Sequence, residues 1–139
     1  LGAMGLAGIQ TAETYDGAGL GYQEYIGALE EIAATSGAYA VSVAVSGLPQ
    51  VILSQQANEA QKQKYLPKLA TAEFIGAWGL TEANTGSDAM RMQCTAVKEG
   101  EFWVINGTKN WITNGNSASY YLVIAQKKIL LICEIFYKR

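Results

Sequence analysis

The periodicity of apolar residues changes near Gly76, and this change constrains the fold more than any other feature of the 139-residue chain. Before that point apolar residues recur at helical spacing, as at Tyr22, Ile26 and Leu29, whereas afterwards they alternate with polar residues as strands do. Helices followed by strands favour an α+β fold over an alternating α/β one. We therefore predict a helix bundle followed by an antiparallel β domain.

Three segments of the first half have the features of helices. Residues 22–33 place apolar side chains on one face and glutamate or glutamine on the other, which predicts an amphipathic helix. Residues 36–53 are apolar on nearly every side, which predicts a buried helix that Pro49 kinks or ends. Asn58, followed three residues later by a glutamine, resembles a capping box and predicts a third helix, which Pro67 breaks or restarts.

The second half alternates between apolar and polar residues. Residues 93–98 and 101–106 flank a Glu-Gly turn and predict a β-hairpin. Residues 108–113 and 119–125 predict two further strands. The closing run, residues 127–139, is apolar and β-prone and ends on two basic residues, so it is either an edge strand or an out-of-frame tail.

The composition excludes several classes of function. The chain has no histidine, which removes histidine-based triads and metal ligands, and its two cysteines are too few for a four-thiolate zinc site. A net charge of −2 with ten lysines and arginines disfavours nucleic-acid binding. No apolar run reaches the roughly 18 residues of a membrane helix. We therefore expect no metal centre, no nucleic-acid partner and no membrane insertion.

The strongest local motif is W-G-L-T-E-A-N-T-G-S-D at residues 78–88. It is rich in small and hydroxyl-bearing residues, so its backbone amides can approach a planar or anionic ligand closely. The alternative is a turn between domains, in which Thr81, Ser87 and Asp88 satisfy their own backbone.

A second motif, Trp111-Ile112-Thr113, precedes an Asn-Gly turn. Trp111 is either a core residue at the end of a strand or a flat apolar surface for a ligand. Thr113 is either an ordinary turn residue or a hydrogen-bond donor to a ligand. Taken one at a time, the two motifs leave these alternatives open.

Together the motifs resemble those of the acyl-CoA dehydrogenase flavoproteins, whose loop reads aromatic-x-x-T-E-P-x-x-G-S-D and whose second motif is W-I-T-N-G. The similarity includes Y-x-G-A-G-L at residues 15–20 and N-E-x-Q-K-Q-K-Y-L-P at residues 58–67, and covers about residues 1–125. It implies part of an N-terminal helical domain over residues 1–75. Part of a middle β domain would follow over 76–139, although its last 14 or so residues do not resemble the family.

The resemblance implies FAD as cofactor, with both motifs against its isoalloxazine ring. Thr81 would hydrogen-bond the ring, Thr113 would donate near its N5 atom, and Ser87 would also contact the acyl-CoA thioester. Such donors favour a reduced flavin, which carries negative charge. Glu82 is interpreted as a residue that holds the loop. The implied flavin-contacting residues are Trp78, Gly79, Leu80, Thr81, Glu82, Ala83, Asn84, Thr85, Gly86, Ser87, Trp111, Ile112 and Thr113.

The resemblance also implies a reaction and partners. An acyl-CoA thioester would lose its α proton to a glutamate and its β hydride to flavin N5, and the electrons would pass to an electron-transfer flavoprotein. The family is usually homotetrameric and lies in the bacterial cytoplasm or the mitochondrial matrix.

The chain departs from the family pattern in two respects. Ala83 replaces the usual proline of the loop, and no residue corresponds to the catalytic glutamate, which follows the β domain in the family. We therefore expect weak or absent FAD binding and no turnover by this chain alone. The alternatives are an acyl-CoA oxidase or other flavin-dependent relative, and a non-enzymatic α+β binding module.

Overall fold

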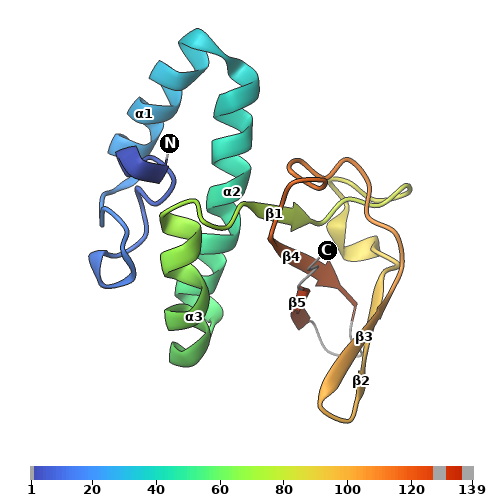
Figure 1. The fold of residues 1–139 in the computed structure, drawn as a ribbon. Coiled ribbons are helices and arrows are strands. Elements are labelled where there is room, and N and C mark those ends of the chain that lie inside the picture. Colours follow the sequence, from blue (N-terminus) through green and yellow to red (C-terminus); the bar gives the residue numbers. More distant parts are fainter. Residues whose placement is uncertain (1, 127–130, 136–139) are drawn as a thin grey trace.

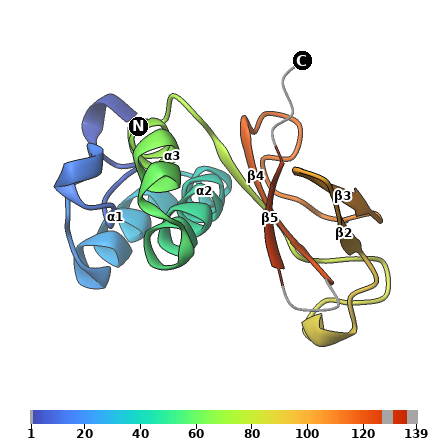
Figure 2. The same cartoon turned by 90° about the horizontal axis from the view of Figure 1, so that it is seen from below.

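The helices and strands occupy opposite sides of the molecule and are joined by the first strand. The computed structural model describes residues 2–126 and 131–135 (Figure 1). Figure 2, seen from below, shows the same separation of helices from strands. The helices are α1 (Tyr22–Thr35), α2 (Gly37–Gln56) and α3 (Glu59–Ala70), with 3₁₀ turns at Gly2–Met4, Glu13–Tyr15 and Ala89–Arg91. The strands are β1 (Gly76–Gly79), β2 (Thr95–Glu99), β3 (Phe102–Asn106), β4 (Tyr120–Ala125) and β5 (Leu131–Ile135).

Helix α3 begins where its sequence predicts. The Asn58 side chain accepts a hydrogen bond from Gln61 N at 2.9 Å, and the Gln61 side chain accepts one from Asn58 N at 3.0 Å. This reciprocal capping box is confirmed. The prediction that Pro67 breaks the helix is wrong, because α3 continues to Ala70. Both the amide and the hydroxyl of Thr71 donate to the Pro67 carbonyl, which closes the last turn beyond the proline.

Helix α2 runs through Pro49 to Gln56, so the prediction that this proline ends the helix is wrong. Pro49 is fully buried, and the first residue of β1 packs directly on it. A Cβ atom at Gly76 would lie only 2.9 Å from the Ser46 carbonyl oxygen and 3.2 Å from the Pro49 ring. Packing against β1 therefore offsets the backbone hydrogen bond that the proline cannot make.

The prediction that α2 is buried on all sides is also wrong. Its buried face consists of Ala40, Val43, Pro49, Gln50 and Leu53. Tyr39, Val41 and Leu48 are exposed. The expected apolar face of α1 is only half-covered, since Tyr22 and Ile26 are exposed as well.

By length and composition, α2 is long and apolar enough to cross a membrane. It is the one helix that meets this test among the described residues, and it corrects the expectation that no segment would. Core helices of soluble proteins pass the same test, and the buried face of α2 packs within this fold.

The sheet topology confirms the α+β class and corrects one pairing. The predicted hairpin forms as β2 and β3, with Val97 opposite Val104. A separate sheet has the order β1-β4-β5. Strand β4 pairs antiparallel with β5 but parallel with β1, with Gly76 opposite Tyr120, so the strands are not uniformly antiparallel. The long connection from β1 to β4 makes this parallel pairing possible.

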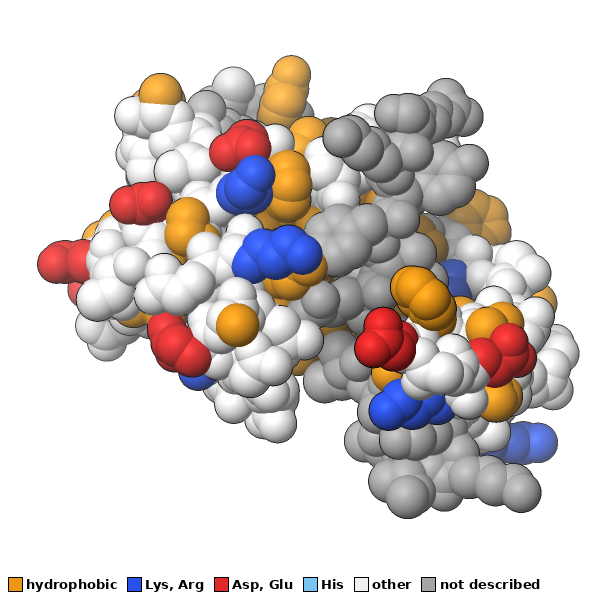
Figure 3. Space-filling model, turned by 60° about the horizontal axis from the view of Figure 1, so that its bottom comes forward, with side chains coloured by type: hydrophobic (Ala, Val, Ile, Leu, Met, Phe, Trp, Pro, Cys, Tyr) orange, Lys and Arg blue, Asp and Glu red, His pale blue; other side chains and the backbone are white. Residues whose placement is uncertain are grey.

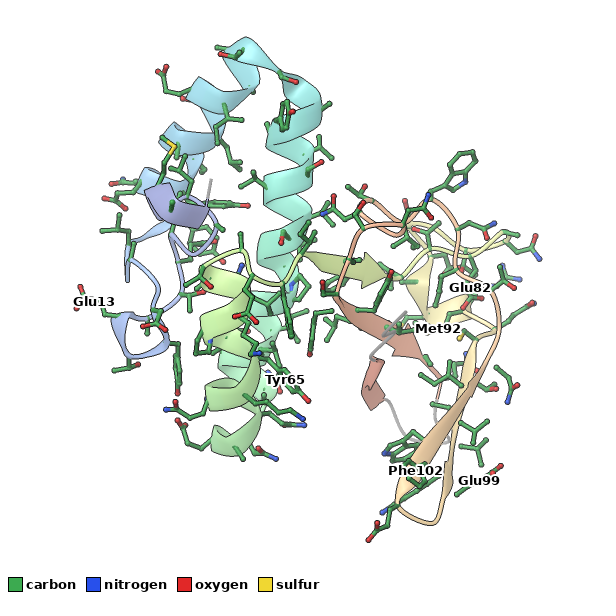
Figure 4. All side chains as sticks on the ribbon, in the orientation of Figure 1. Glu13, Tyr65, Glu82, Met92, Glu99 and Phe102 are labelled. Carbon is green, nitrogen blue, oxygen red and sulfur yellow. The ribbon has the colours of Figure 1, made fainter. Side chains whose placement is uncertain are left out.

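One apolar core spans the helices and the sheet. Its buried members come from α2, α3 and β4, and they are Leu53, Tyr65, Leu66, Leu69, Tyr120 and Leu122. The rings of Tyr65 and Tyr120 lie 5.3 Å apart between centroids, and Figure 4 shows Tyr65 on the side of α3 nearer the strands. The division into domains at residues 75 and 76 stays a prediction, because the packing is continuous across it.

The closing run contains a strand. Strand β5 pairs along β4 at the edge of the sheet, as the edge-strand alternative predicts. Residues 127–130 and 136–139 of that run lie outside the described residues. On the face drawn in Figure 3, acidic and basic side chains are interspersed over the described residues, in keeping with the net charge of −2.

Candidate functional site

The first motif leaves strand β1 and folds into a tight turn. Trp78 and Gly79 belong to β1, and Leu80 and Thr81 follow it. The amide of Glu82 donates to the Thr85 carbonyl at 2.9 Å, and the amide of Thr85 donates back to Glu82 at 3.2 Å. Ala83 and Asn84 therefore form the exposed tip of the turn, and Gly86 and Ser87 beyond it are also exposed.

Glu82 holds the loop from inside, as the sequence predicts. Its carboxylate is buried and accepts hydrogen bonds from Gln93 N at 2.6 Å, Cys94 N at 2.9 Å and Lys109 Nζ at 2.7 Å. Burial disfavours the charged form, but these three donors outweigh burial and hold the pKa of Glu82 below its usual range. A carboxylate so fully engaged is poorly placed to act as a base.

Lys109 is the residue of this site that sequence reasoning missed. Its ammonium donates to both Glu82 Oε1 and the Leu80 carbonyl oxygen, at 2.7 and 2.8 Å. Its side chain is only 10% exposed, so the ion pair with Glu82 is shielded from water. The available signal was a lysine inside an otherwise uncharged motif-bearing segment, residues 107–118.

The second motif is a loop, and the prediction of a strand over residues 108–113 is wrong. Trp111 has a φ of +59° and Asn114 a φ of +64°, left-handed conformations that a strand does not contain. Trp111 is 92% exposed, so its interpretation as a core residue is also wrong. Ile112 and Thr113 are half-buried.

The two motifs lie side by side. Asn110 N donates to the Thr81 carbonyl at 2.9 Å, next to the hydrogen bonds that Lys109 makes to residues 80 and 82. Neither the Thr81 nor the Thr113 hydroxyl has a hydrogen-bond partner within the described part of the chain. Figure 4 places Glu82 at the opposite end of the β2–β3 hairpin from Glu99 and Phe102.

The arrangement fits a planar ligand with hydrogen-bonding edges. An exposed indole, two half-buried hydroxyls with no partner among the described residues, and the exposed residues Gly86 and Ser87 are the groups that such a ligand requires. Nucleophilic chemistry by Cys94 is disfavoured, because burial raises the pKa of its thiol and outweighs the lowering by the Lys109 charge, while the Glu82 charge raises the pKa by a smaller amount.

A separate cavity of about 260 Å³ lies in the helical part. Its lining includes Ile9 from the N-terminal segment, Tyr25 from α1, and Gln50 and Val51 from α2. None of its lining residues belongs to either motif.

Comparison with known proteins identifies relatives along most of the chain. The family description "Acyl-CoA dehydrogenase, N-terminal domain" matches residues 1–73, and "Acyl-CoA dehydrogenase, middle domain" matches residues 77–131. Mitochondrial isovaleryl-CoA dehydrogenase of Pongo abelii is 44% identical over 133 residues, which are 95% of this chain and 31% of that protein. The short-chain specific acyl-CoA dehydrogenase of Clostridium acetobutylicum is 41% identical over 126 residues, 90% of this chain and 33% of that protein.

Solved structures agree with this similarity. The glutaryl-CoA dehydrogenase of Mycobacterium smegmatis in complex with FADH2 matches with a TM-score of 0.91 at 34% identity, over 97% of this chain and 35% of that one. The chain spans about a third of the length of the curated relatives it matches. With both family descriptions matching in order and the two motifs adjacent in the fold, the chain belongs to the acyl-CoA dehydrogenase family.

Proposed function

We propose that the chain binds the isoalloxazine ring of FAD along the two joined motifs. Residues 78–87 line one side of the ring, and Trp111, Ile112 and Thr113 cover the other. The observation that carries this proposal is the hydrogen bond from Asn110 to Thr81, because it joins the loop to the residue that directly precedes the exposed Trp111. An aromatic side chain with almost no protein contact gains most from a planar partner.

Each residue would act on the ring through its own chemistry. Thr81 and Thr113 would donate hydrogen bonds to the ring, since neither hydroxyl has a hydrogen-bond partner among the described residues. The Trp111 indole would exclude water from one face of the ring. Glu82 would contribute by holding the loop rather than by touching the ligand, since its carboxylate is already saturated. When bound, the flavin supplies a hydride acceptor.

For a family protein of full length that contains these segments, we propose α,β-dehydrogenation of an acyl-CoA thioester, with Ser87 against the thioester. The names of the relatives specify isovaleryl-CoA, short-chain and glutaryl-CoA dehydrogenases, which supports a short or branched acyl group. A solved neighbour titled as an electron transferring flavoprotein of Acidaminococcus fermentans supports flavin-to-flavin electron transfer. A homotetramer and a bacterial cytoplasmic or mitochondrial location stay predictions.

A fluorescence titration of FAD tests the ring contact. We expect the chain to quench flavin fluorescence at high protein concentration, because the indole stacks on the ring. Trp111→Ala should weaken binding about fivefold or more, since an aromatic pair contributes about 1 kcal/mol beyond burial. Phe102→Ala is the matched control, because Phe102 is 76% exposed at the far end of the hairpin. Equal binding by Trp111→Ala and the unaltered chain would contradict the proposal.

A further inference from the structure

Among the described residues the Trp111–Thr113 segment pairs with no strand, yet hydrogen bonds hold the residues on both sides of it to other elements. Residues 109 and 110 bond to the first motif, and Asn114 bonds to α2 and β1. Two residues of this region have a left-handed backbone: Trp111, which follows the bonded residues 109 and 110, and Asn114 itself. A bulky residue in this conformation is costly and persists only where its surroundings fix it.

Lys109 provides the first tie. Its ammonium joins Leu80 O and Glu82 Oε1, one on each side of Thr81, while the next amide, Asn110 N, donates to Thr81 O itself. Three consecutive residues of the first motif are therefore bonded to the two residues that directly precede the second motif. Because the ion pair is buried, salt and water weaken it little.

Asn114 provides the second tie. Its side-chain amide donates to Ser42 O in α2 and to Gly76 O at the start of β1, both at 3.1 Å. Its backbone carbonyl accepts from Ser117 N and Ala118 N, at 2.9 and 2.8 Å. Asparagine suits this place because it tolerates the left-handed conformation and carries two donors.

We propose that Lys109 and Asn114 are positioning residues that hold Trp111, Ile112 and Thr113 in place for the ligand, Lys109 by binding the first motif and Asn114 by binding α2 and β1. The ligand in this statement is the flavin of the proposed function, on which that part of the inference rests. The restraint itself is a property of the chain without ligand, and it can be measured separately.

Amide hydrogen exchange measures the restraint. Lys109→Met should raise exchange at Asn110 N about tenfold or more relative to Ala96 N, because it removes a charge-assisted tie beside that amide. Ala96 N bonds to Gln126 O in the hairpin region, so it reports general destabilisation. Lys98→Met is the matched control, since Lys98 is an exposed lysine of β2.

Asn114→Gly removes the side-chain amide without straining the backbone, because glycine adopts a left-handed φ freely. It should raise exchange at Gly115 N, which bonds to Ile112 O at 3.0 Å, while Asn116→Gly in the same turn should not. Unchanged exchange at these amides in folded variants would overturn the proposal. So would a rise no larger than that at Ala96 N.

Lys109→Met leaves the Glu82 carboxylate buried without its cation, which can prevent the variant from folding. A second variant covers that case. Glu82→Gln combined with Lys109→Met removes both charges and should give the same local rise at Asn110 N. No local rise in this double variant would equally overturn the proposal.

The flavin readout separates this inference from the proposed function. With FAD bound, Asn114→Gly should show less quenching of flavin fluorescence at saturation, because the indole no longer keeps its stacking geometry. Asn116→Gly should match the unaltered chain. If the unaltered chain fails to bind FAD, the proposed function fails while the exchange result still decides the restraint. If FAD binds and the exchange is unchanged, only the restraint fails.

Discussion

The buried pair of Glu82 and Lys109 gives the sharpest prediction about stability. Their side chains are 8% and 10% exposed, and the carboxylate accepts three hydrogen bonds within 2.9 Å. Removing one partner of a buried pair leaves an unpaired charge and typically costs about 3–5 kcal/mol. We expect Glu82→Gln to lose about 3 kcal/mol of unfolding free energy, since glutamine keeps one acceptor for the backbone amides.

Urea unfolding followed by circular dichroism at neutral pH measures this loss. The same pair in a double-mutant cycle should be strongly coupled, so that Glu82→Gln with Lys109→Met loses less than the sum of the single variants by about 1 kcal/mol or more. Asp88→Asn is the matched control, because the Asp88–Arg91 pair is exposed on both sides and 3.8 Å long. It should change stability by less than about 0.5 kcal/mol.

The reasoning would be refuted if Glu82→Gln and Lys109→Met each changed stability by no more than the Asp88→Asn control. That result would mean that the loop does not depend on its internal ion pair. A loss of about 3 kcal/mol matters because domains of this kind are stable by only about 5–15 kcal/mol in total.

Three further predictions concern the same region. The folded-state pKa of Glu82 lies below its unfolded value near 4.5, so the stability that its charged carboxylate contributes is present above that pH and is lost on acidification. The stability difference between the unaltered chain and Glu82→Gln should therefore shrink in acid unfolding titrations. Thr85→Val should be neutral or stabilising by up to about 1 kcal/mol in urea, because the buried Thr85 hydroxyl has no hydrogen-bond partner among the described residues. Gly107→Ala should lower the melting temperature by an amount equivalent to about 1–3 kcal/mol, since its Cβ would lie 2.8 Å from the Cys94 Cα and Cβ atoms.

The sequence predicted correctly those elements that are determined by residues close together in the chain. The capping box at Asn58 fixes the start of α3, and the Glu-Gly turn joins β2 to β3. The interpretation of Glu82 as a residue that holds the loop is also confirmed by its three donors. In each case the residues that decide the outcome are few and their chemistry is specific.

Tertiary packing explains the predictions that were wrong. Pro49 does not end α2, because β1 packs on it, and this contact depends on Gly76, far along the chain. The alternation over residues 108–113 does not form a strand, because the Asn110 amide donates to the Thr81 carbonyl and the Lys109 side chain is bound to Glu82. A periodicity reports which residues are apolar, but it does not report which distant groups compete for the backbone.

In the candidate site, too, local motifs were predictable and the hydrogen bonds between distant segments were not. The resemblance predicted that the two motifs meet, and the structure joins Thr81 to Asn110, the residue before Trp111. The sequence offered a lone lysine in an uncharged segment but not its partners, because Lys109 and Asn114 donate to carbonyl groups of other segments and backbone acceptors have no sequence signature.

The central claim is that the two motifs together bind the isoalloxazine ring of FAD, with residues 78–87 on one side of the ring and Trp111, Ile112 and Thr113 on the other. The most direct test is a titration of the isotopically labelled chain with FAD, followed by amide and indole chemical shifts, which detects weak binding. We predict progressive shifts at the Trp111 indole N–H and at the amides of Thr81, Ser87 and Thr113, with none at Val97 in the hairpin. No shifts at these groups, or shifts confined to the helical part, would contradict it.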